Sequence, residues 1–80
     1  MKTVHVRYFA VLREQRGLEE ERIETEAVSA AELYEELRGR HRFSLPADRL
    51  RVAINDDFAP WTALVNDGDE LVFIPPVAGG

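Results

Sequence analysis

Hydrophobic and polar residues alternate in three stretches of this chain, around residues 4–8, 22–26 and 50–55. A period of two places every second side chain on the same face, which is typical of a strand with one buried face. The alternation around 22–26 is weak, and we expect an edge strand there. Between the first two stretches, residues 10–16 are mostly good helix formers that stop at Gly17, which predicts a short helix. The apolar positions of the three strands are Val4, Val6 and Tyr8, then Ile23, then Leu50, Val52 and Ile54.

A second and longer helix is predicted by its N-terminal signals. Ser29 is followed three residues later by Glu32, which is the spacing of a capping box. Val28 and Leu33 stand at the two positions that form a hydrophobic staple. We expect this helix to end at Gly39. Its apolar residues lie on one face and are Ala30, Leu33, Tyr34 and Leu37.

Two turn signals divide the last part of the chain, at residues 55–57 and 66–69. Between them the stretch 58–61 is long enough only for a short strand. Pro60 lacks the N–H group that a central strand needs, so this stretch is expected at an edge of the sheet. Residues 71–74 are apolar at every position, which predicts a strand covered on both faces, and a pair of prolines ends it.

The order of these elements predicts an α+β fold. One main helix packed across a mixed sheet of four or five strands is the simplest way to bury the apolar faces. Eighty residues make a single domain with one core. We assign residues 1–74 to this domain and residues 75–80, which carry no charged side chain, to a flexible tail.

Composition excludes several classes of function. The formal net charge is −5, whereas binding to nucleic acid needs a basic face. The chain has no cysteine, which excludes disulfides, thiolate metal sites and a catalytic thiol and is typical of a reducing cytoplasm. Polar residues interrupt the apolar ones near the N-terminus, so neither a signal peptide nor a membrane span is expected there.

Few residues in the body of the chain suggest chemistry. His5 and His41 have no serine or acidic partner at a recognisable spacing, and we expect surface or structural roles for both. Ser29 is explained as a cap, which leaves Ser44 as the only other serine and gives a hydrolytic triad no support. Residues 67–70 are acidic but lack the spacing of a calcium loop. No glycine loop for phosphate is present, and we expect no metal site and no stably bound cofactor.

The chain ends on Gly79 and Gly80, after an uncharged run. Glycine leaves the terminal carboxylate unshielded and lets the backbone enter a narrow passage. Because no other reacting group is evident, the carboxylate of Gly80 is the first candidate. Whether Phe73, Ile74 or Trp61 belongs to the core or to a contact surface is left open by the sequence.

The ending of the chain, residues 73–80, resembles the tail of the small, sulfur-carrying subunit of molybdopterin synthase. Residues 8–14 are similar to the first strand and short helix of that family, and residues 52–55 and 67–70 to its later strand and turn. The resemblance covers nearly the whole chain, and the sequence Pro-Pro-Val-Ala-Gly-Gly is its most specific part. Pro60 departs from the family pattern.

The resemblance implies a ubiquitin-like β-grasp fold and a carrier role. Gly80 would be adenylated by a partner that uses ATP and is related to ubiquitin-activating enzymes, and a sulfur donor would convert it to a thiocarboxylate. The tail would then enter the large synthase subunit, in a heterotetramer, and deliver sulfur to cyclic pyranopterin monophosphate. Acid–base residues would belong to the large subunit. The residues expected to contact partners are Phe73, Pro75, Pro76, Val77, Ala78 and Gly79.

Three other functions share some of these features. A sulfur carrier for thiamine synthesis and a protein tag joined to lysines would also end in Gly-Gly. The Pro-Pro-Val-Ala segment and the length of this chain favour the molybdopterin carrier over the thiamine carrier. A β-grasp interaction domain without chemistry is the alternative from a different class.

Overall fold

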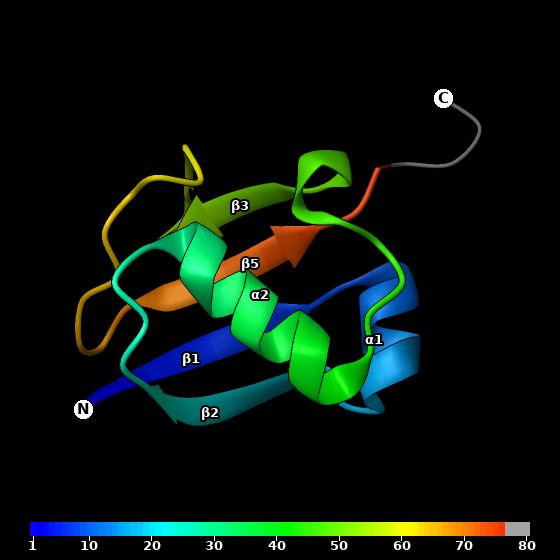
Figure 1. The fold of residues 1–80 in the computed structure, drawn as a ribbon, viewed down its shortest axis with the longest axis horizontal. Helices are drawn as coiled ribbons and strands as arrows, with labels where there is room; N and C mark the ends of the chain where they lie inside the picture. The colour runs from blue at the N-terminus through cyan, green and yellow to red at the C-terminus, as the bar shows by residue number, and fades with distance from the viewer. Residues whose placement is uncertain (77–80) are drawn as a thin grey trace.

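The computed structural model describes residues 1–76, and residues 77–80 lie outside the described part. Five strands form one mixed sheet in the order β2-β1-β5-β3-β4, in which β1 and β5 are parallel and the other neighbours antiparallel. The helix α2 lies across one face of the sheet, and the short helix α1 lies at one end (Figure 1). The predicted α+β fold is confirmed. The strands are β1 (Lys2–Tyr8), β2 (Glu20–Thr25), β3 (Arg51–Ile54), β4 (Asp57–Ala59) and β5 (Glu70–Ile74), and the helices are α1 (Ala10–Arg16), α2 (Ala30–His41) and the 3-10 helix η1 (Ala47–Arg49).

The core lies between α2 and the inner face of the sheet. Strand register places the inward side chains side by side, with Tyr8 on β1 and Val52 on β3 each paired with Phe73 on β5. Tyr34 of α2 packs on Phe73 at a ring-centroid distance of 5.1 Å. The side chains buried to less than 2% exposure include Tyr8, Tyr34, Phe73, Leu12, Leu33, Leu37, Leu71, Val4, Val6, Val52 and Val65. The alternation in the first stretch is therefore the alternation of buried and outward positions, whereas β3 buries both Val52 and Ala53.

The N-terminus of α2 is capped as predicted. The Ser29 side chain accepts a hydrogen bond from the backbone N–H of Glu32 at 3.2 Å. Burial does not support the staple: Leu33 is fully buried, but Val28 is 53% exposed. The backbone carbonyl of Val28 instead accepts a hydrogen bond from the N–H of Val65, which ties the helix start to a distant loop.

The predicted end of this helix at Gly39 is wrong. The helix continues through His41 and ends at Arg42, which takes a left-handed conformation with φ of 57°. A glycine inside a helix costs about 1 kcal/mol but does not stop it. The chain leaves the helix where Phe43 becomes buried against Tyr8 and Tyr34, so tertiary packing decides the end point.

Strand β5 is central, but it is not covered on both faces as predicted. Leu71 and Phe73 point into the core, while Val72 and Ile74 are half-buried on the outer face. The helix α2 lies on the other side of the sheet and α1 at its end (Figure 1), so no helix within residues 1–76 covers the outer face of β5. An unbroken apolar run therefore marked a central strand of a sheet with one open face.

The predicted turns and the edge strand are confirmed. Asn55 and Asp56 both have positive φ, 51° and 75°, and form the tight turn between β3 and β4. Gly68 has φ of 88° in the turn before β5. Strand β4 lies at the edge of the sheet and ends directly before Pro60, where the missing N–H breaks no ladder.

Within residues 1–76, no helix has both the length and the apolar character needed to cross a bilayer.

Candidate functional site

The residues that lead into the tail leave the sheet from its centre. We call Ile74, Pro75 and Pro76 the tail base. Ile74 ends β5, Pro75 is buried against the body, and Pro76 is exposed. Figure 1 shows that this point lies at the end of the molecule where α1 and η1 also lie. A central strand flanked by two others gives the tail base a rigid origin.

Phe73 was expected among the partner-binding residues, and the structure corrects this. Its side chain has no exposed surface and packs between Tyr34 and Trp61. The register of β5 explains the result, because Phe73 pairs with Tyr8 and Val52 on the inner face. Phe73 therefore anchors the strand that carries the tail, and Ile74 takes the outward position.

An apolar groove lies on one side of the tail base. Phe9, Ala10, Val11 and Leu45 line it together with Ile74, Pro75 and Pro76. Phe9 is 44% exposed, so part of its side chain is accessible at this groove. Sequence reasoning missed these residues. The available signal was Phe9 itself, an apolar residue that follows Tyr8 directly and so breaks the alternation.

A more polar groove lies on the other side. Asp48, Arg49, Leu50 and Arg51 line it together with the same three tail-base residues. Arg49 belongs to η1 and Arg51 begins β3, the strand that pairs with Ile74 of β5. The tail base therefore borders an apolar groove and a second groove that contains two arginines.

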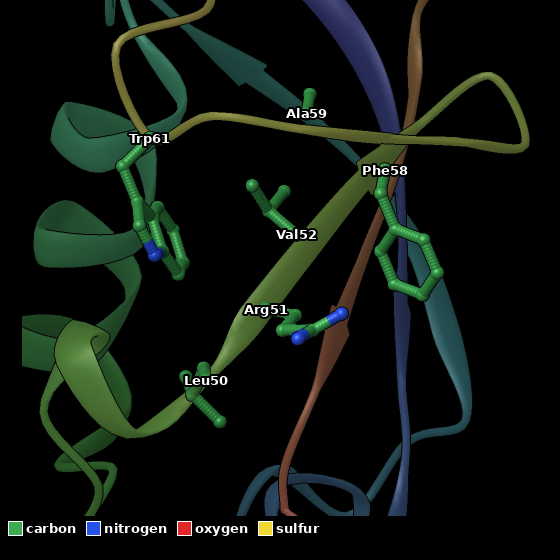
Figure 2. Close-up of a pocket in the computed structure, with 6 residues that line it drawn as sticks. All are labelled: Leu50, Arg51, Val52, Phe58, Ala59 and Trp61. Atoms are coloured by element: carbon green, nitrogen blue, oxygen red, sulfur yellow. The ribbon is translucent and has the colours of Figure 1, made fainter.

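A third hollow lies along β3 next to the edge strand. Figure 2 shows Val52 and Trp61 on one side of β3, and Arg51 and Phe58 beside each other on the other side. The guanidinium of Arg51 is 5.5 Å from the centre of the Phe58 ring, a cation–π contact. Trp61 stacks on Phe73 at 6.0 Å, so this tryptophan packs against the core.

The two histidines do have acidic neighbours, which sequence spacing alone did not reveal. His5 lies between Glu20 and Glu70, with nitrogen–oxygen distances of 3.0 and 3.2 Å. Strand pairing brings these carboxylates from positions 15 and 65 residues away along the chain. Both side-chain partners of His5 are carboxylates on neighbouring strands, which fits the structural role expected for His5.

The second histidine, His41, lies beside a partly buried ion pair. Arg16 donates two hydrogen bonds to Glu21, at 2.8 and 2.9 Å, and Tyr8 donates a third at 2.7 Å. The hydrogen bond from Arg16 lowers the pKa of Glu21, and burial raises the pKa of Tyr8. Burial lowers the pKa of His41, whose ring is 3.9 Å from Glu21. These contacts join α1, β1, β2 and α2, and their role is structural.

Among residues 1–76, no three His, Cys, Asp or Glu side chains are placed to bind a metal ion. Every buried side-chain nitrogen or oxygen in the same range has a hydrogen-bond partner. Ser44, the serine without a cap role, exchanges two hydrogen bonds with Gln15. The predicted reacting residue, Gly80, and the tail residues Val77, Ala78 and Gly79 lie outside the described part of the chain.

Comparison with known proteins finds one matching family and two relatives that share the same name. The model of the ThiS family matches residues 6–80. The chain is 36% identical over 84 residues to the molybdopterin synthase sulfur carrier subunit of Mycobacterium tuberculosis, and the match covers 100% of both chains. It is 34% identical to the protein of the same name in Haemophilus influenzae, over 96% of this chain and 99% of the relative.

Solved structures agree with these relatives. The chain is similar to a putative molybdopterin converting factor subunit 1 of Pyrococcus furiosus, with a TM-score of 0.80, 32% identity and coverage of 96% and 100%. It is also similar to a chain in a complex of subunits 1 and 2 of the molybdopterin-converting factor of Helicobacter pylori, with a TM-score of 0.67, 28% identity and coverage of 98% and 99%.

A third structure is the small archaeal modifier protein SAMP1 of Haloferax volcanii, with a TM-score of 0.80, 25% identity and coverage of 98% and 99%. All three are small proteins matched over nearly their full length. Together with the family model and the two sequence relatives, they establish that this chain belongs to the ThiS family.

Proposed function

We propose that this chain is the sulfur carrier subunit of a molybdopterin synthase and acts in the biosynthesis of the molybdenum cofactor. The observation that carries the proposal is the end-to-end match with two relatives of that name, at 34% and 36% identity. The structure supports it in a second way. The described body has its polar groups satisfied and places the tail base on a central strand, as suits a carrier whose reacting group lies at the chain end.

The proposed chemistry takes place at Gly80. A carboxylate becomes an acylating group only when one oxygen is given a leaving group. In the proposed sequence, the Gly80 carboxylate attacks the α-phosphorus of ATP bound to an activating partner, and pyrophosphate leaves. Sulfur at the oxidation level of sulfide, supplied by the donor, then attacks the carbonyl and displaces AMP, and the terminus becomes a thiocarboxylate. No cofactor is held by this chain itself, and the acid–base groups belong to its partners.

Delivery requires a short distance between the body and the partner. Residues 75–80 span at most about 20 Å when fully extended, at about 3.3 Å per residue. A partner that accepts Gly80 in its active site must therefore contact the surface around the tail base. We propose that the apolar groove of Phe9, Val11 and Leu45 packs against the large subunit there, and that the sulfur passes to cyclic pyranopterin monophosphate.

The partners of this proposal are the large synthase subunit, an adenylating enzyme of the ubiquitin-activating type and a sulfur donor. The Helicobacter pylori structure supports the first, because it holds subunits 1 and 2 in one complex. We propose a heterotetramer with two carriers and a cytoplasmic location, where ATP is available.

The direct test converts the terminus in vitro. Incubation with the cognate activating enzyme, ATP and a sulfur source should replace one oxygen of Gly80 by sulfur, and intact-mass analysis measures this change. A known carrier run in parallel controls for active reagents. Failure of this chain to convert while the known carrier converts would contradict the proposal.

A second test moves the reacting group without changing the fold. One alanine added after Gly80 should leave the melting temperature nearly unchanged, because chain ends add little to the core. It should abolish sulfur delivery, since it displaces the carboxylate by about 3.3 Å and a shift of about 1 Å can reduce a rate a hundredfold. Wild-type synthesis of molybdopterin by the extended chain, with the added residue confirmed in place, would indicate a passive module.

A protein tag is the second candidate, because the chain also resembles SAMP1, a small archaeal modifier protein. The two functions differ in the product. A tag forms an amide with a lysine of another protein, whereas the carrier gives up its sulfur and is released with Gly80 as a free carboxylate. Mass spectrometry of tryptic peptides from cells distinguishes them, because a tag leaves its terminal residues on target lysines.

A further inference from the structure

The basic residues of this chain are almost all arginines. Lys2 is the only lysine among the ten basic residues, so the other nine are arginines. Lysine and arginine carry the same charge but differ in reactivity. An ammonium group loses its proton readily enough to act as a nucleophile, whereas a guanidinium stays protonated in proteins. The chain also contains no cysteine, so it offers no thiol to an acylating agent.

The arginines concentrate at the end of the molecule that carries the tail base. Because β1 and β5 are parallel, both strands finish at this end of the molecule. The helices α1 and η1 and the end of α2 lie beside it (Figure 1). Arg49 and Arg51 line the polar groove together with Pro75 and Pro76. Seven of the nine arginines belong to this end: Arg13, Arg16, Arg38, Arg40, Arg42, Arg49 and Arg51.

The single lysine lies at the opposite end. In the parallel pairing of β1 with β5, His5 lies opposite Glu70. Lys2 is three residues before His5 along β1, and Pro76 is six residues after Glu70. The two residues are therefore nine positions apart along the strand direction. Nine residues of strand correspond to about 30 Å. Residues 77–80 span at most about 13 Å when fully extended. The amine of Lys2 is therefore out of reach of the Gly80 carboxylate in the same molecule.

Lys2 is also engaged in a contact. Its ammonium donates a hydrogen bond to the backbone carbonyl of Ala27, and the pair is partly buried. This bond joins the start of β1 to the segment that precedes α2. Attack on an acyl group requires the amine to lose both this bond and its proton, which lowers its reactivity toward the terminus of a second copy.

We propose that the body of this chain is built so that its activated terminus cannot acylate the chain itself, with guanidinium groups near the tail and the one side-chain amine held about 30 Å away. This inference deepens the proposed function and rests on it, since only an activated terminus needs such protection. In the reaction that is avoided, an amine attacks the activated carbonyl of Gly80. An amide forms, the leaving group departs and the amine proton passes to solvent. The carrier would then be lost as a closed loop.

The test introduces an amine near the tail without changing the charge. Arg49→Lys and Arg51→Lys place amines beside Pro75 and Pro76, and Arg22→Lys is the matched control on β2. Arg22 pairs with His5 and so lies at the level of Glu70, about 20 Å from Pro76 along the strands. Each chain is prepared with Gly80 as a C-terminal thioester, made by intein cleavage, so that the terminus is activated without any partner enzyme.

The expected products differ by position. On standing at mildly alkaline pH, the Arg49→Lys and Arg51→Lys chains should lose the thiol and form an internal amide at least tenfold faster than the wild type or Arg22→Lys. Intact mass measures the loss of the thiol without gain of water, and peptide mapping locates the new bond. Circular dichroism confirms that each variant is folded.

Two outcomes would overturn the inference. One is equal rates of internal amide formation in all four chains. The other is a wild-type product that joins Gly80 to Lys2, within a chain or between two copies. Neither outcome depends on an activating enzyme, so both are distinct from a failure of the proposed function, which would appear as an absence of thiocarboxylate in the enzymatic reaction.

Discussion

Single residues stabilise this fold mainly by satisfying polar groups where elements meet. Ser29 caps α2, and Tyr8, Arg16 and Glu21 form a hydrogen-bonded group between α1, β1 and β2. Glu21 is only 15% exposed at its side chain, so its charge depends on Arg16 for compensation. Two predictions follow at this scale, one for the cap and one for the ion pair.

Replacing Ser29 by alanine should lower the free energy of unfolding by about 1 kcal/mol, because the N–H of Glu32 loses its acceptor. Ser29→Thr retains a hydroxyl group and should lower the free energy of unfolding less than Ser29→Ala does. Urea unfolding at neutral pH measures both variants. The exposed Thr62→Ala substitution is the control and should change little. A Ser29→Ala chain as stable as the wild type would show that the cap contributes nothing.

Replacing Glu21 by glutamine should cost about 1–3 kcal/mol near pH 7, because Arg16 then faces a neutral partner. The pKa of Glu21 is lower in the folded chain than its ordinary value of 4.5, chiefly through Arg16. Its contribution to stability is therefore fully present above pH 4.5 and is lost as the pH falls through the folded pKa. The difference between wild type and Glu21→Gln should shrink over that acid range, as measured by unfolding at a series of pH values. A constant difference would contradict the assignment.

At the scale of elements, the ends of helices and strands depend on what the next residues bury. The helix α2 passes through Gly39 because Phe43 enters the core only after Arg42. Strand β5 is apolar from Leu71 to Ile74 and lies between β1 and β3, although one of its faces is open. The glycines can be divided in the same way by their surroundings. Gly17 and Gly68 have positive φ, whereas Gly39 lies inside a helix and does not.

Replacing Gly39 by alanine should stabilise the protein by about 0.8–1 kcal/mol. The position is helical, and an added Cβ has no neighbour within 4 Å. Gly17→Ala and Gly68→Ala also have free space but require a left-handed backbone, with φ of 81° and 88°, and should destabilise. Thermal unfolding of the three variants compares them directly. Destabilisation by Gly39→Ala would show that this residue has a role beyond the helix backbone.

At the scale of the whole molecule, charge is distributed along the long axis. Most arginines lie at the end with the tail base, whereas the turns at the opposite end carry carboxylates, among them Asp56, Asp57, Asp67 and Asp69. Although the net charge is −5, the end with the tail base is less acidic than the opposite end. Under the proposed function, a partner that receives the tail approaches this end, and the electrostatic potential there guides the encounter.

Reversing one charge at this end, Arg49→Glu, should slow association with the large synthase subunit several-fold at low ionic strength. Arg22→Glu, away from the tail base, should have a smaller effect. Stopped-flow association at two salt concentrations measures both, and the difference should shrink as salt screens the charges. Equal effects of the two variants would place the contact surface elsewhere.

Local sequence patterns were sufficient to predict most of the helices and strands. Alternation identified β1 and β3, the Ser29–Glu32 spacing identified the start of α2, and Pro60 placed β4 at an edge. These features depend on backbone geometry and on residues close in sequence, so they can be read without the fold. The mixed β-grasp arrangement and the family resemblance were also predicted, and the importance of Gly80 stays a prediction from sequence.

Tertiary structure alone decided the features that depend on long-range neighbours. The burial of Phe73 follows from its pairing with Tyr8 and Val52. The grooves beside the tail base join residues from β1, α1, η1 and β5, which only folding brings together. The distance between Lys2 and the tail base likewise follows from the parallel pairing of β1 and β5. Sequence therefore determined which residues could form strands, helices and a reactive end, whereas strand order and register determined what surrounds that end, because contacts between distant segments leave no local pattern.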